Sequence, residues 1–195
     1  MILYLTVIIG ATIMISIFNI ALFSISFFSV SALEILGISI ATVIFEIAIN
    51  GITAFLIHCL PKKWFSAERK LFKVFKWERK FYEKLGIKHW KDKVLELGSL
   101  NGFSKNKIND PTNPEYFSNF IIESNNGILD HLLSIFTGFG CCLLFPQYFL
   151  TIGLPASIVG AILNILPIFI LRYNIPKLLI ARERAIRVKE RESKQ

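Results

Sequence analysis

The sequence predicts an all-α integral membrane protein with about four transmembrane helices in two hairpins and a cytoplasmic, interfacial helical domain between them. The 195-residue chain is 53% hydrophobic and only 18% charged, whereas soluble domains are usually about 25% charged. No Asp, Glu, Lys or Arg occurs before Glu34 or between Asp130 and Arg172. Both uncharged runs exceed the about 20 residues that a helix needs to cross a bilayer. Helices are expected there because a helix pairs its own backbone polar groups within lipid.

The four spans are predicted within Ile2–Phe28 and at about Ile35–Leu60, Leu132–Phe149 and Pro155–Tyr173. Short links that carry Gly and Pro or Ser separate the first span from the second and the third from the fourth, which predicts two hairpins. The N-terminus lacks the basic region of a secretory signal, and its apolar run is longer than a signal needs. We therefore expect a retained first helix.

The distribution of Lys and Arg predicts the orientation in the membrane. These residues crowd the segment from Pro61 to Lys93 and the tail from Arg172 onwards, and the two short links carry none. Two spans separate the basic segments, so both fall on one side, which the positive-inside rule makes cytoplasmic. We predict a multi-pass protein with its polar domain and both termini in the cytoplasm.

Four regions follow from this topology: residues 1–60 as the N-terminal transmembrane hairpin, 61–130 as a basic and aromatic cytoplasmic interfacial domain, 131–176 as the C-terminal transmembrane hairpin, and 177–195 as a basic cytoplasmic tail. The stretch "WFSAERKLFKVFKWERKFYEKLG" mixes aromatic residues, among them Phe72, with cations at roughly helical spacing. This pattern predicts a helix that lies in the headgroup plane, where cations meet anionic lipid. Gly86 is expected to end it. Nucleic-acid binding is the disfavoured use of such a strip, because apolar spans flank it.

The segment from Gly86 to Asn113 is expected to be an ordered loop or short helix followed by a turn-rich link. Asn113 is expected to cap the next helix, with Pro114 at its first position. We expect that helix to enter the membrane near His131, with a bend at Gly127.

His131 is the most suggestive residue for chemistry, because histidine is the side chain most easily tuned as a general base near neutral pH. Asp130 is its neighbour in sequence, but adjacent residues do not face each other on a helix. Glu123 precedes it by eight residues, a rise of about 12 Å in a straight helix, so contact would need a kink or a bridging substrate. The structural alternative is an interfacial histidine that donates to a carbonyl.

Other polar residues lie within the predicted spans or at their ends. The second span contains Glu46, Asn50 and His58. Ionisable groups at membrane depth usually face the interior of the helix bundle or a transport pathway. A structural polar contact between helices explains these residues equally well. At the end of the last span, Arg172 is either a membrane anchor or a clamp for an anionic group. No metal-ligand spacing is present among the Cys and His residues, so no metal site and no bound cofactor are expected.

Four stretches together resemble the bacterial glycosyl-4,4'-diaponeurosporenoate acyltransferase family of staphyloxanthin-type carotenoid biosynthesis. They are "KWERKFYEKLGIKHWKDKVLELG", "FIIESNNGILDH", "NILPIFILRYN" and the adjoining "IPKLL". The matching features, in order, are Glu78 with Phe81 and Tyr82; Trp90, Lys91 and Lys93; Glu123 and His131; and Asn164, Pro167, Arg172, Tyr173, Asn174 and Pro176. The resemblance covers about Pro61 to Arg184. The first span looks like an addition, because members of this family are shorter at the N-terminus.

The resemblance implies transfer of a fatty acyl group, from acyl-CoA as the expected co-substrate, to a sugar hydroxyl of a glycosylated isoprenoid, carotenoid or related glycolipid. It implies His131 and Glu123 as catalytic residues, with His131 taking the hydroxyl proton and Glu123 orienting the sugar or balancing charge. The implied substrate-binding residues are Trp90 as a stacking platform, Lys91, Lys93 and Arg172 for CoA phosphates, Asn164 and Asn174 as oxyanion donors, and Tyr173.

Two alternatives belong to other classes of protein. A non-enzymatic membrane scaffold or lipid-binding accessory protein would need only the basic, aromatic segment and apolar faces. A transporter would use Glu46 as a pathway residue, but four spans are few unless the protein forms oligomers. The expected partners are membrane lipids, the glycosylated acceptor and the acyl donor, and no nucleic acid.

Overall fold

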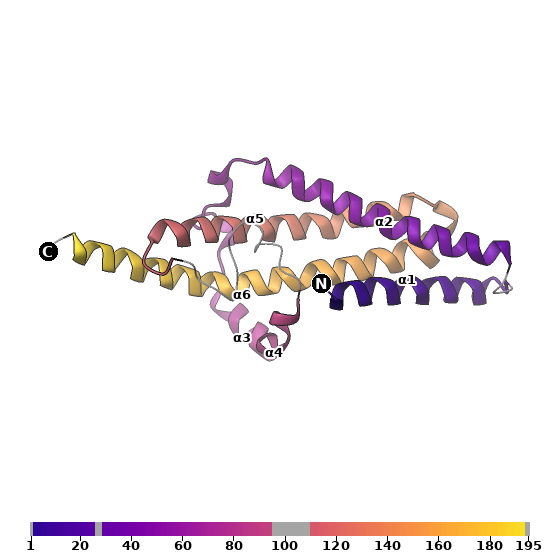
Figure 1. Ribbon diagram of the computed structural model, residues 1–195, viewed down its shortest axis with the longest axis horizontal. Coiled ribbons are helices and arrows are strands. Elements are labelled where there is room, and N and C mark those ends of the chain that lie inside the picture. The colour runs from indigo at the N-terminus through magenta and orange to yellow at the C-terminus, as the bar shows by residue number, and fades with distance from the viewer. Residues whose placement is uncertain (1, 26–28, 95–109, 194–195) are drawn as a thin grey trace. The chain divides into compact units, whose positions relative to one another are not determined.

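The computed structural model describes residues 2–25, 29–94 and 110–193. The helices long enough to matter for the membrane are α1 (Ile2–Leu22), α2 (Val30–His58), α5 (Pro114–Gly138) and α6 (Leu154–Glu192). The segment between α2 and α5 contains the shorter elements η1 (Lys62–Phe65), η2 (Lys70–Phe72), α3 (Lys76–Lys84), α4 (Ile87–Trp90) and η3 (Lys91–Lys93). Between α5 and α6 lie η5 (Phe139–Leu143), η6 (Pro146–Tyr148) and η7 (Phe149–Gly153). All of these elements are helical (Figure 1).

Four segments of the described chain are long and apolar enough to cross a membrane: Tyr4–Leu22, Val30–His58, Pro114–Leu143 and Pro146–Glu192. The all-α class and the four membrane-length helices are therefore confirmed. The last two helices extend well beyond the predicted spans. The third begins at Pro114, and the fourth continues to Glu192 through Pro167 and Pro176.

The chain divides into two compact units. Unit 1 comprises Met1–Leu56 and Asp130–Leu166, and unit 2 comprises Ile57–Leu129 and Pro167–Gln195. Because α5 and α6 each contribute to both units, a candidate residue is placed by its unit as well as by its helix.

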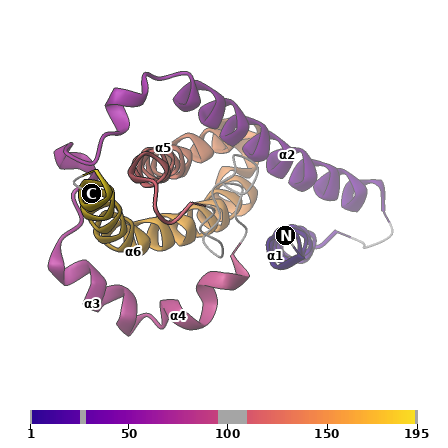
Figure 2. The same cartoon turned by 60° about the vertical axis from the view of Figure 1, so that its left-hand side comes forward.

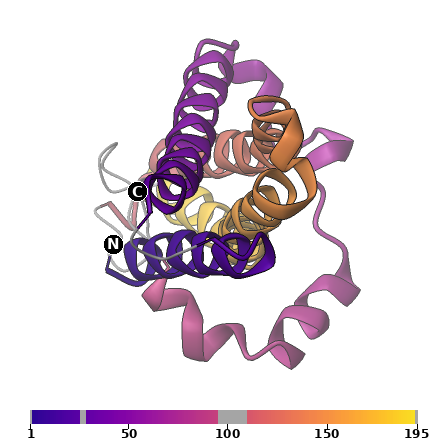
Figure 3. The same ribbon diagram turned by 90° about the vertical axis from the view of Figure 1, so that its right-hand side faces the viewer.

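In unit 1, α1 supplies donors to two carbonyls that each lie four residues before a proline. A proline at position i lacks the N–H that would bond the carbonyl of residue i−4. The carbonyl of Leu163, four residues before Pro167, accepts from the Tyr4 hydroxyl at 3.0 Å. The carbonyl of Thr151, four residues before Pro155, accepts from Asn19 Nδ2 at 2.9 Å. These contacts place α1 along η7 and the first half of α6, as Figure 3 shows.

In unit 2, the segment from η1 to α4 arcs around parts of α5 and α6 (Figure 2). A core of Ile57, Phe65, Phe72, Ile128 and Ile175 holds this arc in place. The side-chain amide of Asn125 on α5 donates to the carbonyl of Phe65 at 2.8 Å, which joins the arc to the helix.

The predicted in-plane helix is shorter than expected. Two 3₁₀ turns replace its first part, and α3 begins only at Lys76. Phe72, expected at the lipid surface, is instead buried in the core of unit 2. The physical reason is that Lys73 and Phe75 have extended backbones, so the chain turns Phe72 inward before the helix starts.

Three local predictions can be compared with the structure. Asn113 Oδ1 accepts from the backbone N–H of Glu115 at 2.9 Å, which confirms the N-cap and the start of the helix at Pro114. Gly86 follows α3 with φ +66°, the left-handed conformation that suits a glycine after a helix. Gly127 lies inside one continuous α5. A Cβ there would approach Leu171 Cδ1 to 3.2 Å, so this glycine lets α5 and α6 pack closely in unit 2.

The predicted link between Gly86 and Asn113 can be compared with the structure only in part. Its beginning forms α4 and η3, and residues 95–109 lie outside the described residues.

Candidate functional site

The pairing of His131 with Asn164 is the main polar feature of unit 1 for chemistry. His131 lies on α5 and Asn164 on α6, 33 residues apart in sequence, and the Nδ1 atom of His131 is 2.9 Å from Oδ1 of Asn164. Both side chains are half-buried. Both residues were candidates from the sequence, His131 as a general base and Asn164 as an oxyanion donor, but their contact with each other was not predicted.

The amide of Asn164 determines which imidazole nitrogen carries the proton. Its Nδ2 donates to the carbonyl of Gly160 at 3.0 Å, one turn earlier on α6. The opposite orientation would place Oδ1 against that carbonyl, so Oδ1 is the atom that faces His131. Because Oδ1 only accepts hydrogen bonds, Nδ1 of the neutral ring must donate. Nε2 is then left with a free lone pair, which is the arrangement a general base requires.

Asp130 is tied to its own helix. Ser134 Oγ donates to Asp130 Oδ1 at 3.5 Å, one turn further along α5. The partner that orients the His131 ring is therefore an amide on the neighbouring helix, and the adjacent carboxylate makes a separate contact.

Glu46 occupies a notch made by two glycines in unit 1. Its side chain on α2 is buried, with 7% exposed. The carboxylate lies 3.2 Å from the position that a Cβ at Gly138 would take, and it fills the position of a Cβ at Gly160. Gly160 is also the residue whose carbonyl holds the Asn164 amide. The notch and the His131–Asn164 pair therefore share one turn of α6.

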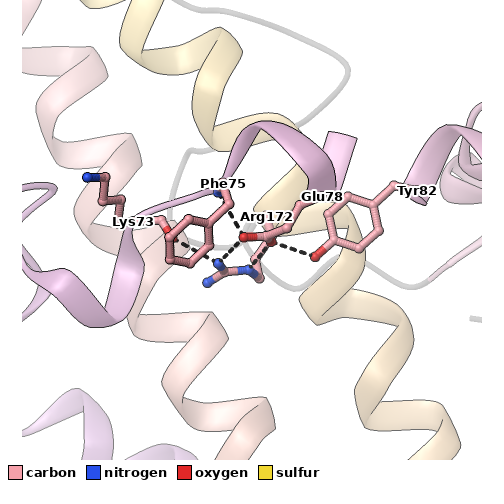
Figure 4. Close-up of polar contacts among 5 residues, drawn as sticks. All are labelled: Lys73, Phe75, Glu78, Tyr82 and Arg172. Carbon is pink, nitrogen blue, oxygen red and sulfur yellow. Dashed lines mark hydrogen bonds and ion pairs between the residues drawn. The ribbon is translucent and has the colours of Figure 1, made fainter. Parts of the chain in front are cut away.

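Unit 2 contains a second polar cluster, centred on Arg172 and Glu78 (Figure 4). Arg172 on α6 donates from Nε to Glu78 Oε2 and from Nη2 to Glu78 Oε1, each at 2.7 Å. Its Nη2 also donates to the carbonyl of Lys73 at 3.0 Å. The two side chains are mostly buried, with 16% of Arg172 and 4% of Glu78 exposed.

Two further donors complete the shell of Glu78. The hydroxyl of Tyr82 donates to Oε2 and the backbone N–H of Phe75 donates to Oε1, both at 2.9 Å. The Phe75 contact also caps the start of α3, because Glu78 is the third residue of that helix. Tyr82 packs in turn on Phe169 of α6, with ring centroids 5.2 Å apart. This network fastens α3 to α6.

Electrostatics within the cluster follow from burial and from these donors. Burial alone would raise the pKa of the Glu78 carboxyl, but the Arg172 guanidinium and the hydrogen bonds from Phe75 and Tyr82 outweigh it and lower the pKa below its ordinary value. Burial, with the hydrogen bond to the Glu78 carboxylate, raises the pKa of Tyr82 to about 12. At neutral pH the cluster therefore holds a charged carboxylate and a neutral phenol.

The remaining catalytic and substrate-binding residues that the resemblance implied all belong to unit 2. The indole N–H of Trp90 donates to the carbonyl of Leu85 at 3.0 Å, and Lys91 lies 3.5 Å from a carboxylate oxygen of Asp92. Tyr173 is buried and its hydroxyl donates to Glu83 at 3.5 Å. The others are Lys93, which is exposed, and Glu123 and Asn174, which are half-buried. The structure thus brings together His131 with Asn164, while Arg172 finds a partner that the sequence reading did not assign.

Glu78 and Glu83 are the residues that the sequence reading missed as partners of α6. One feature of the sequence could have indicated them: each is a lone carboxylate among neighbouring Lys and Arg residues. Glu78 also lies four residues before Tyr82, which places the two on one face of a helix. That face is the buried face of α3, where Glu78 and Tyr82 are the buried residues.

Comparison with known proteins gives one result. A family model described as Glycosyl-4,4'-diaponeurosporenoate acyltransferase matches residues 61–184, which is more than half of the chain. The matched region begins and ends where the resemblance read from the four sequence stretches does. No curated protein and no solved structure matches the chain significantly.

Proposed function

Because the chain belongs to the glycosyl-4,4'-diaponeurosporenoate acyltransferase family, we propose that it transfers a fatty acyl group from acyl-CoA to a sugar hydroxyl of a glycosylated carotenoid. The family makes the chain an acyltransferase and implies a glycosylated diaponeurosporenoate as the acceptor. The CoA thioester, the hydroxyl position and the extension to related glycolipids are our additions. The observation that carries the mechanism is the hydrogen bond between His131 and Asn164.

In this mechanism His131 is the general base. Its Nε2 takes the proton from the sugar hydroxyl while the hydroxyl oxygen attacks the thioester carbonyl. The carbon–sulfur bond then breaks, the new ester forms, and the imidazolium returns the proton to the departing CoA thiolate. General-base catalysis of this kind contributes about 10²–10⁴-fold to a rate.

Asn164 is a positioning residue in this mechanism. Its Oδ1 holds Nδ1–H of His131, and the charge that develops on the ring during proton transfer strengthens that contact. Its amide nitrogen donates one of its two protons to the Gly160 carbonyl, and the oxyanion-donor role expected of the other proton remains a prediction from the resemblance. The roles expected for Glu123 and Asn174 remain predictions from the resemblance.

A membrane location suits an acceptor with a long apolar tail. The four membrane-length helices support insertion, and unit 2 exposes the large aromatic side chains of Trp64, Phe75, Trp77 and Phe81. Large aromatic side chains beside Lys and Arg favour the headgroup region of a bilayer. We propose that both hairpins span the cell membrane and that these aromatic side chains lie in its cytoplasmic leaflet.

The proposal is tested by mass spectrometry of lipid products. Purified protein in lipid nanodiscs is supplied with acyl-CoA and a glycosylated carotenoid, and His131→Ala is compared with wild type. The matched control is His58→Ala, because His58 is an exposed histidine on α2. The proposal predicts a new ester with wild type and with His58→Ala but not with folded His131→Ala. Absence of any ester with wild type would favour a non-enzymatic, lipid-binding role.

A further inference from the structure

Glu83 gathers cationic side chains from two helices of unit 2. Its Oε1 lies 3.4 Å from Arg79 Nε, one turn earlier on α3, and 3.4 Å from Lys88 Nζ on α4. The same oxygen accepts from the hydroxyl of Tyr173 on α6 at 3.5 Å. One carboxylate therefore brings α3, α4 and α6 together at a single point.

Further positive charge meets at this point. The ammonium of Lys177 lies over the ring of Tyr173, 4.1 Å from its centroid. Its charge lies within electrostatic range of Arg79, Lys88 and Lys91 as well as of Glu83. We name Arg79, Lys88, Lys91 and Lys177 the Glu83 cluster. Within the part of the chain that the structure describes, Arg79 and Lys88 share the one carboxylate of Glu83, and Lys91 contacts Asp92 at 3.5 Å.

Access separates this cluster from Arg172. The Nε and Nη2 atoms of Arg172 already donate to Glu78 and to the Lys73 carbonyl, and the side chain is only 16% exposed. In the Glu83 cluster the side chains of Arg79 and Lys88 are 66% and 63% exposed. These cations can reach a ligand in solvent without leaving a buried carboxylate unpaired.

We propose that the Glu83 cluster binds phosphate groups of the acyl donor. Guanidinium and ammonium groups form short, charge-assisted hydrogen bonds to phosphate oxygens, and like charges held together are relieved when an anion enters. The inference rests on the proposed function, because CoA is the phosphate-bearing part of the proposed donor. Anionic lipid headgroups carry the same chemistry, so the experiment must separate the two sources.

The experiment measures binding of CoA without an acyl group, so that binding is read independently of catalysis. Protein in nanodiscs of neutral lipid is titrated with CoA by calorimetry. The test variant is Lys88→Gln with Lys177→Gln. The control is Lys62→Gln with Lys63→Gln, two exposed lysines of the same unit. A rescue variant, Lys88→Arg with Lys177→Arg, keeps the charges.

The proposal predicts that the test variant binds CoA about tenfold more weakly for each cation removed, since one hydrogen bond to a charged group has roughly that effect. The control and the rescue variant bind as wild type does. Equal affinity of wild type and test variant would overturn the assignment. The assignment would also be overturned if the test variant bound CoA as wild type does but bound more weakly to vesicles that contain phosphatidylglycerol. The phosphate recognised by the cluster would then belong to lipid.

The outcome is independent of the proposed catalytic role. His131→Ala serves in the same titration and is expected to bind CoA normally. If wild type binds CoA through the cluster but makes no ester, the phosphate site stands and the proposed function fails. If wild type makes the ester but the test variant binds CoA with wild-type affinity, the proposed function stands and the phosphate site fails.

Discussion

The carboxylate of Glu46 fills the space that a Cβ atom at Gly160 would take. Glycine at this position on α6 is therefore required by close approach of a side chain from α2. The same turn of α6 holds the Asn164 amide through the Gly160 carbonyl. Packing at the notch and orientation of the His131 partner are thus linked through one residue.

Gly160→Ala is expected to destabilise the protein by about 1–3 kcal/mol, the usual cost of adding a methyl group to a filled space. In a Glu46→Ala background the added methyl group has room, so the double variant should be more stable than the sum of the single effects. The free energy of unfolding is measured in mixed micelles for wild type, Gly160→Ala, Glu46→Ala and the double variant.

Gly51→Ala is the control for that cycle. Gly51 lies on α2, and nothing lies within 4 Å of a Cβ built there. Alanine in an open helical position stabilises by about 0.5–1 kcal/mol relative to glycine. Strict additivity between Gly160→Ala and Glu46→Ala would show that the notch does not couple the two residues.

Tyr4→Phe tests whether α1 stabilises the proline-containing part of α6. The change removes the donor to the Leu163 carbonyl, which Pro167 leaves without its usual partner, and it should cost about 1 kcal/mol. Thermal unfolding in detergent measures the loss. Tyr148→Phe, which also removes a hydroxyl in unit 1, is the control. Equal stability of Tyr4→Phe and wild type would mean that the carbonyl is satisfied in another way.

Arg172→Met is expected to cost about 3–5 kcal/mol, because it leaves a buried carboxylate without its charged partner. Arg187→Met on the same helix is the control. Its pair with Glu183 spans 3.9 Å with both side chains mostly exposed, so about 1 kcal/mol or less is expected. Unfolding of both variants in detergent at neutral pH gives the comparison. Similar losses in the two would contradict the view that Glu78 and Arg172 fasten α3 to α6.

The stabilising effect of Glu78 should depend on pH in a defined direction. Its pKa is lowered in the folded protein from the ordinary value of 4.5, so the folded state favours the charged form. The resulting stability is fully present above the ordinary pKa and is lost as the pH falls through the folded pKa. Unfolding of wild type and Glu78→Gln should therefore differ by a constant amount at neutral pH and converge only in acid. Convergence already near pH 6 would contradict the lowered pKa.

Much of the helical framework could be predicted from the sequence because its signals are local. Long uncharged runs predict membrane-length helices, Asn113 and Pro114 predict a helix start, and Gly86 predicts a helix end. Each of these signals depends on a few neighbouring residues, and the structure confirms each one.

The pairings could not be predicted, because they depend on how one helix is aligned against another. His131 and Asn164 were both recognisable as polar residues beside apolar runs, but their contact depends on the alignment of α5 with α6 in unit 1. Similarly, Arg172 was recognisable as a membrane anchor or a clamp for an anionic group, but its contact with Glu78 depends on the position of α3. The length of α6 also escaped prediction, because a proline is tolerated where a neighbouring helix supplies a donor, as Tyr4 does.

The central claim is that His131 acts as a base held by Asn164, and a kinetic double-mutant cycle on ester formation tests it most directly. The rates of His131→Ala, Asn164→Leu and the double variant are compared with wild type by mass spectrometry. The claim predicts that His131→Ala lowers kcat by about 10²–10⁴-fold, that Asn164→Leu lowers it less, and that the double variant is no slower than His131→Ala. A His131→Ala protein with the wild-type rate, or independent and multiplying effects of the two changes, would contradict it.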